Sequence, residues 1–239
     1  MKIQTQTLSF LDHLDELRGR VLQYLFVYIV CCLITYPLTG RVLPFLIKPV
    51  GSVIFSAPGE AFSAYMLFTL IEAFILSLPV FLYHAWAFAW EALTINERKY
   101  ILIFGPLSLV FFLSGGVFAY FVIAPIAITF LFGFSSAYVV PMINIKNYIS
   151  FIGSLILSFG VVFELPLILM FLVKIGIASP AFLRYYRKHA IFAIFVLSAI
   201  LTPPDVVSQI LMAVPLIVLY ELGIVFSNFA YQKDSLAKL

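Results

Sequence analysis

Charged residues are scarce in this sequence. Aspartate, glutamate, lysine and arginine together make up 10% of its 239 residues, whereas apolar residues make up 64%. Soluble domains contain about 25% charged residues. This deficit leaves no room for a separate soluble domain, so we predict an integral membrane protein in which residues 1–239 form a single membrane domain.

Cysteine and histidine are too few, and too scattered, to build a disulfide framework or a metal site. The two cysteines, Cys31 and Cys32, are neighbours within one apolar stretch, so neither has a partner elsewhere in the chain. The three histidines, His13, His84 and His189, are far apart in the sequence. We therefore expect no disulfide, no bound metal and no cofactor.

Familiar catalytic motifs are also missing. The sequence has no Gly-x-x-x-x-Gly-Lys-Ser/Thr phosphate loop, no His-Glu-x-x-His and no Gly-x-Ser-x-Gly. Its apolar stretches contain no pair of aspartates of the kind an intramembrane protease uses. The protein is therefore expected not to be an enzyme, and we expect no nucleic-acid partner.

Long apolar stretches dominate what is present. Because about 20 apolar residues cross a bilayer, they predict an all-α protein with six transmembrane helices, the last two short. The predicted spans are residues 21–38, 65–90, 100–123, 149–173, 190–201 and 206–226. The third span contains Gly105, Pro106, Gly115 and Gly116, so we expect it to be kinked and closely packed.

Lysine and arginine are distributed unevenly over the two sides of this topology. An even number of spans places both termini on one side, which carries Lys2, Arg18, Arg20, Arg98, Lys99, Lys174, Arg184, Arg187, Lys188, Lys233 and Lys238; the other side carries Arg41, Lys48 and Lys146. Basic residues accumulate in cytoplasmic loops, which predicts cytoplasmic termini and periplasmic caps at residues 39–64 and 124–148. Trp86, Phe88 and Trp90 are then an aromatic belt at the cytoplasmic interface.

The N-terminal segment has the pattern of an amphipathic helix over residues 8–20. Ser9 and Asp12 fit a capping box. Leucines recur at helical spacing and charged residues occupy the opposite face, namely Asp12, Asp15, Glu16, Arg18 and Arg20. We expect this helix to lie on the cytoplasmic surface, and a simple surface anchor is the alternative reading. Since the first apolar run follows these charges and continues as a full span, we expect no cleavable signal peptide.

Glu164 is the one charged residue in the run Ile149–Val173. A carboxylate at this depth costs several kcal/mol unless it faces protein or water, so such residues commonly mark functional sites. Pro166 removes a backbone donor two residues later and predicts a local break in the helix. The functional alternative is a polar site within the membrane; the structural one is a protonated side chain bonded to a neighbouring helix.

The last two spans form a short hairpin. Residues 190–201 give about 18 Å of helix against a hydrocarbon core of roughly 30 Å. The turn beginning at Thr202 and ending at Asp205 should therefore lie below the outer membrane surface, beside a thinned bilayer and a concave helix bundle. Ser208 and Gln209 add further polar groups at this depth.

Several motifs together resemble the TatC family, the multi-spanning core subunit of the twin-arginine protein translocase. They are HLDELRGR at residues 13–20, NER at 96–98, FAYF at 118–121, FG at 159–160, FELP at 163–166 and TPPD at 202–205 followed by Ser208 and Gln209. The resemblance extends from about Leu8 to Phe229. One departure is Glu91, where many members have proline, and we assign no role to Glu72.

This resemblance implies a receptor for signal peptides with consecutive arginines on folded cargo. It implies single-span partners TatA and TatB, a homo-oligomeric receptor complex in a bacterial-type inner membrane among its lipids, and export driven by the proton-motive force. Arginines bind carboxylates bidentately, and Glu16 and Glu97 are the candidate carboxylates. The remaining expected site residues are Phe88, Arg18 and Arg20 for the signal peptide, and Thr202, Asp205 and Gln209 for a partner helix.

A proton-coupled small-solute transporter is the alternative function. Its proton relay would use Glu164 and Glu221. Such transporters often contain internal repeats, and the two halves of this sequence show none.

Overall fold

The computed structural model describes residues 10–133, 135, 141–201 and 206–236, and in this part of the chain the fold is built from helices. They are α1 (Phe10–Ile47), α2 (Pro58–Ala92), α3 (Ile95–Phe118), α4 (Ala124–Phe132), α5 (Ile145–Phe163), α6 (Leu165–Lys174), α7 (Pro180–Tyr185), α8 (Arg187–Leu201) and α9 (Val206–Leu236). A short 3₁₀ helix, η1 (Lys48–Val50), follows α1, and a π-helical turn, η2 (Ala119–Ile123), joins α3 to α4. The all-α class predicted from the sequence is confirmed.

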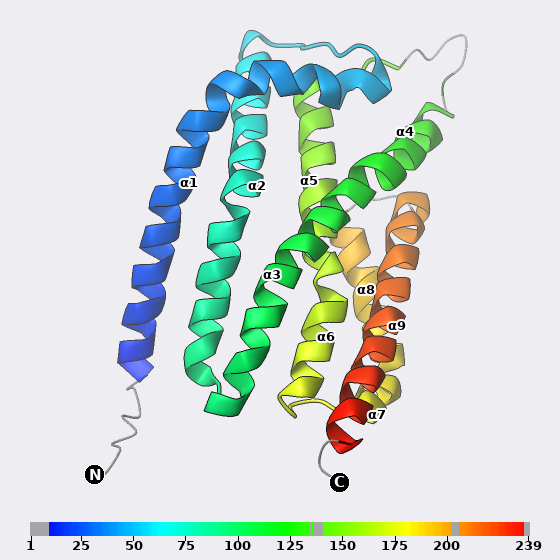
Figure 1. The fold of residues 1–239 in the computed structure, drawn as a ribbon. Helices are drawn as coiled ribbons and strands as arrows, with labels where there is room; N and C mark the ends of the chain where they lie inside the picture. Colours follow the sequence, from blue (N-terminus) through cyan, green and yellow to red (C-terminus); the bar gives the residue numbers. More distant parts are fainter. Residues whose placement is uncertain (1–9, 134, 136–140, 202–205, 237–239) are drawn as a thin grey trace.

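The helices form an upright bundle in which both ends of the described chain lie at the same end, here called the inner end (Figure 1). The α2–α3 connection and α7 also lie there, whereas α1 ends and α2 begins at the opposite, outer end. The central helix α5 packs against α2, α3, α8 and α9. Its most buried side chains, Ile149, Ile152 and Phe159, form the middle of the apolar core.

In the part of the chain that the structure describes, five stretches are long and apolar enough to cross a membrane. They are Asp15–Val50, Pro58–Trp90, Glu97–Phe132, Ile145–Lys174 and Gln209–Phe229. The 15-residue helix α8 is shorter than a full span, so the sixth crossing remains a prediction. In Figure 1, α8 and the start of α9 stop short of the level that α2 and α5 reach at the outer end.

The helix α1 is longer than the sequence analysis expected. Residues assigned to a surface helix, to the first span and to the start of the outer cap form one 38-residue helix. Its last turns bend over the outer end of the bundle (Figure 1), where the helix contains Pro37 and Pro44. Proline inside a helix removes a hydrogen bond and produces such bends, so the chain turns without ending the helix.

The outer end is tied together by hydrogen bonds between distant segments. The Tyr148 hydroxyl donates to the Leu46 carbonyl at 2.7 Å. The Asn144 side chain donates to Glu60 Oε2 at 2.7 Å, and Ile54 forms an isolated parallel bridge with Asn144. These bonds attach the α1–α2 connection to the start of α5.

Glycines set the distance between α3 and α5. A Cβ atom on Gly115 would lie 2.4 Å from the Phe159 carbonyl oxygen, and one on Gly160 would lie 2.6 Å from the Phe112 ring. Side chains at these positions would force the helices apart, which explains the close packing that the glycines of the third span predict.

The interface of α1 and α2 contains buried polar groups. The Thr39 hydroxyl donates to Glu72 Oε2 at 2.7 Å and lies 2.9 Å from the Thr69 hydroxyl oxygen. Glu72, to which the sequence assigned no role, thus has a hydrogen-bond partner on the neighbouring helix.

Candidate functional site

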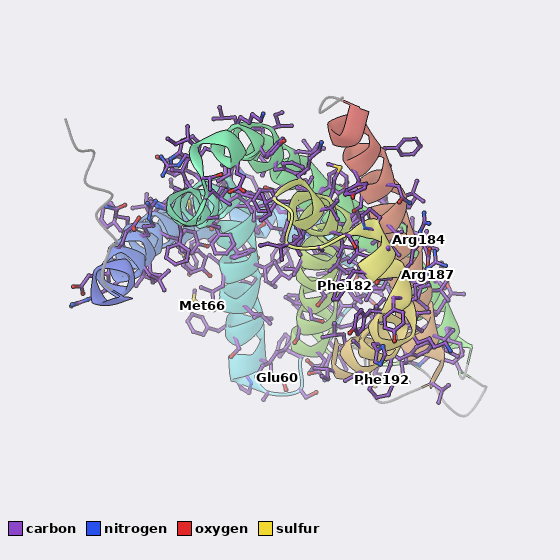
Figure 2. The ribbon with its side chains drawn as sticks, turned by 90° about the horizontal axis from the view of Figure 1, so that it is seen from below. Glu60, Met66, Phe182, Arg184, Arg187 and Phe192 are labelled. Atoms are coloured by element: carbon purple, nitrogen blue, oxygen red, sulfur yellow. The ribbon has the colours of Figure 1, made fainter. Side chains whose placement is uncertain are left out.

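Basic residues gather at the inner end in two groups. One group belongs to α1 and the first turn of α3 and includes Arg18, Arg20 and Arg98. The other belongs to α7 and α8, where Arg184 and Arg187 lie on the side of the bundle away from α1 (Figure 2). Of the predicted signal-peptide residues, Arg18 and Arg20 belong to the first group.

Glu16 and Arg20 form an ion pair one helical turn apart on α1. Glu16 Oε1 accepts hydrogen bonds from Arg20 Nε, at 2.6 Å, and from Arg20 Nη2. About one-fifth of each side chain is exposed, whereas Arg18 is exposed. The structure therefore joins two predicted site residues, and the Glu16 carboxylate already binds a guanidinium through two donors.

Glu97 stands at the start of α3, beside the α2–α3 connection. Its Oε2 accepts a hydrogen bond from the Thr94 backbone N–H at 2.9 Å. This is the glutamate half of a capping box, and the sequence analysis missed its Thr-x-x-Glu signature. Within the described residues no ion pair engages Glu97, so its carboxylate is fixed in place by a neutral backbone donor.

The end of α2 is held by aromatic contacts. Arg98 Cζ lies 5.4 Å from the centre of the Trp90 ring, and Arg98 Nε donates to the Leu93 carbonyl at 3.3 Å. Phe88 is half-buried in the same turns of α2, and its contact with a signal peptide stays a prediction. Arg98 thus orders the connection that presents Glu97.

A groove runs between the inner halves of α2 and α3, and the sequence analysis did not identify it. Its volume is about 620 Å³, and its lining includes Leu82, Trp86, Trp90, Leu102, Gly105 and, from α1, Arg20. The apolar walls and the Glu16–Arg20 pair therefore meet at the inner end. A sequence signal for it was the small residue Gly105 next to Pro106, since together they leave space beside a helix.

Glu164 lies in a break between two helices. α5 ends at Phe163 and α6 begins at Leu165, with Pro166 in its first turn, as expected from the proline. Glu164 Oε1 is buried and has no hydrogen-bond partner among the described residues. Buried polar atoms are nearly always hydrogen-bonded, so this oxygen needs a partner such as water.

The hairpin of α8 and α9 uses some of its polar groups internally. Gln209 Nε2 donates to the Phe195 carbonyl at 3.0 Å, so this side chain bridges the two helices. Thr202 and Asp205, the other two predicted partner contacts, lie outside the described residues. Arg187 Nη2 donates to Glu221 Oε2 at 2.6 Å, so Glu221 is already paired with a cation rather than left for a proton relay.

The fold and the inner-end site define a multi-pass helical membrane protein with charged groups gathered at one end. The family described as "Sec-independent protein translocase protein (TatC)" matches residues 12–215. The chain belongs to this family, whose members are components of a protein translocase and not enzymes.

Individual relatives agree over nearly the whole chain. The protein named TatC from Desulforapulum autotrophicum is 37% identical over 98% of this chain and 90% of its own length. The TatC of Helicobacter pylori strain J99 is 38% identical over 90% of this chain and 87% of its own. A crystal structure titled as the twin-arginine translocase receptor TatC matches with a TM-score of 0.82 and 34% identity, covering 91% of this chain and 99% of that one. These similarities support the translocase and not the small-solute transporter.

Proposed function

We propose that this protein is the signal-peptide receptor and core of a twin-arginine translocation complex. It exports folded proteins across a bacterial-type inner membrane and uses the proton-motive force. The observation that carries the proposal is the pair of carboxylates, Glu16 and Glu97, on two separate segments at the inner end. The solved relative titled as a twin-arginine translocase receptor supports it.

The Glu16–Arg20 pair supports arginine as the ligand of Glu16. The carboxylate accepts from Nε and Nη2 of one guanidinium, a geometry that lysine cannot reproduce. A signal-peptide arginine that displaces Arg20 exchanges one such pair for another.

The second arginine binds Glu97. The hydrogen bond from the Thr94 backbone N–H holds the Glu97 carboxylate beside the α2–α3 connection. Little conformational entropy of this side chain is therefore lost when a ligand binds. The apolar part of the signal peptide lies against the helix bundle, and Phe88 packs against it or orders the loop.

The topology that serves this function has six spans with both termini in the cytoplasm. The ends of the described chain share the inner end (Figure 1), which supports an even number of crossings. The α8–α9 hairpin then provides two short crossings beside a thinned bilayer. Thr202, Asp205 and Gln209 on this hairpin contact the single spans of TatA and TatB, and several copies of the chain associate in the receptor complex.

Binding of a twin-arginine signal peptide to the purified chain tests the proposal. We expect the double variant Glu16→Ala, Glu97→Gln to bind at least tenfold more weakly, because a hydrogen bond to a charged group contributes about 1.5–3 kcal/mol. Gln at position 97 keeps the capping bond from Thr94 and removes only the charge. The matched control is Asp15→Ala, the exposed carboxylate next to Glu16.

The same measurement with a peptide whose two arginines are replaced by lysine provides the second arm. The wild-type protein should bind this peptide as weakly as the double variant binds the original. Unchanged affinity in the double variant, with a normal thermal melt, would reject the assignment of these carboxylates.

A further inference from the structure

The two carboxylates of the inner-end site differ in the groups that they bind. Glu97 Oε2 accepts a hydrogen bond from the neutral backbone N–H of Thr94 at 2.9 Å. Glu16 Oε1 instead accepts from Nε and Nη2 of Arg20, with Nε at 2.6 Å. Glu16 therefore already holds a guanidinium, which is the same chemical group that a signal-peptide arginine would bring to it.

The spacing of Glu16 and Arg20 on α1 favours this contact. Residues four apart lie on one face of a helix about one turn from each other, and α1 is helical through both positions. A glutamate that precedes its basic partner by four residues is the better of the two orders, because it agrees with the helix dipole. The ion pair thus requires only that α1 itself is helical.

Partial burial strengthens the pair relative to an ordinary surface ion pair. Only 21% of the Arg20 side chain and 22% of the Glu16 side chain are exposed. Fully exposed pairs contribute little, because water and salt screen them, and burial reduces this screening. Two N–H donors from one guanidinium also make the contact directional. A ligand that binds Glu16 has to break this contact first.

The surroundings of Arg20 leave room for its side chain to move away from Glu16. Arg20 borders the α2–α3 groove, whose volume is about 620 Å³. Trp86 and Trp90 line the same groove, and guanidinium groups stack on tryptophan rings. A displaced Arg20 side chain therefore has both space and ring faces beside it, and its exchange with a ligand does not require α1 to move.

We infer that Arg20 is an autoinhibitory counter-ion of the receptor site. In the peptide-free protein it occupies Glu16, so the free energy of the incoming ion pair is partly offset by that of the pair it replaces. This inference rests on the receptor function proposed above, because it requires Glu16 to bind a peptide arginine. Glu97, which is held by a neutral donor, contributes its full binding free energy. Arg20 thereby lowers the affinity of the site for signal peptides.

The test is the affinity of a fluorescently labelled twin-arginine signal peptide for the purified full-length protein. Arg20→Gln should bind the peptide about fivefold more tightly, equivalent to about 1 kcal/mol, because Glu16 no longer has to be freed. Arg20→Lys keeps the net charge but offers only a point charge, so its gain should be about twofold. Lys99→Gln, which removes an exposed cation of α3, is the control for lost charge and should match the wild type.

Combined variants and salt show whether the gain acts through Glu16. In a Glu16→Ala background Arg20→Gln should no longer raise the affinity, whereas in a Glu97→Gln background the fivefold gain should persist. The affinity of Arg20→Gln should also fall more steeply with salt than that of the wild type. The variant forms a new ion pair on binding, whereas the wild type exchanges one pair for another, and ion pairs are screened by salt.

Three outcomes overturn the inference. If neither Arg20 variant binds more tightly although Glu16→Ala binds more weakly, the inference fails and the receptor function stands. If the gain persists in the Glu16→Ala background, it reflects lost positive charge and not a freed carboxylate. If the wild type, Glu16→Ala and Glu97→Gln bind the peptide equally, the receptor assignment fails and the inference fails with it. Should Arg20→Gln not fold, as judged by its thermal melt, Arg20→Lys decides.

Discussion

Packing alone does not explain the presence of Glu164 in this membrane domain. One of its oxygens is buried without a hydrogen-bond partner in the part of the chain that the structure describes. Leaving such a group unsatisfied costs about 1–3 kcal/mol, and leucine would avoid this cost. We propose that Glu164, which lies at a break between two helices, serves a polar site within the membrane.

Replacement of Glu164 separates function from stability. We expect Glu164→Leu to insert and to melt at or above the wild-type temperature, because a buried polar group is removed, while export of cargo falls sharply. Glu164→Gln should be intermediate, since it keeps hydrogen bonding without charge. A thermal melt in detergent paired with a cargo-export assay measures both, and wild-type export by the leucine variant would contradict this role.

Single residues also show where the sequence was insufficient. The spacing of Glu16 and Arg20, one helical turn apart, is visible in the sequence. Whether the two side chains form an ion pair depends on their conformations, which the sequence does not show. Thr94 and Glu97 form a capping signature that the Thr-x-x-Glu spacing in the sequence already indicates. The bond from Gln209 to the Phe195 carbonyl depends on how two helices meet, which the sequence does not encode locally.

At the scale of helices, the α3–α5 interface depends on the absence of side chains. We expect Gly115→Ala to destabilise the protein by about 1–3 kcal/mol, the usual cost of overpacking, because the new methyl group would lie 2.4 Å from the Phe159 carbonyl oxygen. Gly59→Ala is the control, since nothing lies within 4 Å of its Cβ position. Equal melting temperatures of the two variants in detergent would show that α3 shifts freely.

The α8–α9 hairpin makes a separate prediction about partners. We expect Gln209→Leu to reduce co-purification of a single-span partner without weakening signal-peptide binding, because polar side chains bond across transmembrane helices for about 1 kcal/mol. The internal bond to Phe195 means that a slightly lower melting temperature should accompany this loss. Val206→Leu, an exposed position near the same end of α9, serves as the control. Normal co-purification would place the contact elsewhere.

Helix bounds differ from the sequence prediction for identifiable reasons. The first span was predicted to end at residue 38 and to be followed by an outer cap, yet α1 continues to Ile47 through Pro37 and Pro44. Tertiary hydrogen bonds such as that from Tyr148 to the Leu46 carbonyl hold this part of α1 as it bends. In contrast, Pro166 was correctly associated with a break. Proline alone does not determine whether a helix bends or ends, because the neighbouring segments supply the partners for the freed backbone groups.

At the scale of the whole molecule, composition determined most of the architecture. Long apolar runs predicted a helical membrane protein, and five apolar stretches agree. The even number of predicted spans placed both termini on one side, and both ends of the described chain lie at the inner end (Figure 1); that this end is cytoplasmic, as the distribution of lysine and arginine predicts, stays a prediction. Gly105 next to Pro106 was a local signal for space beside α3, but the α2–α3 groove itself was not predictable, because it arises where side chains of three helices, including Arg20, come together.

The central claim is that two arginines of a signal peptide bind the inner ends of α1 and α3. Photocrosslinking from peptide positions next to the two arginines, mapped by mass spectrometry on the purified chain, measures this directly. Crosslinks should fall on α1 around Glu16 and on the α2–α3 connection around Glu97, and they should disappear when both arginines are replaced by lysine. Crosslinks at the outer end, around Glu60 or α4, or an unchanged pattern with the lysine peptide, would contradict the account.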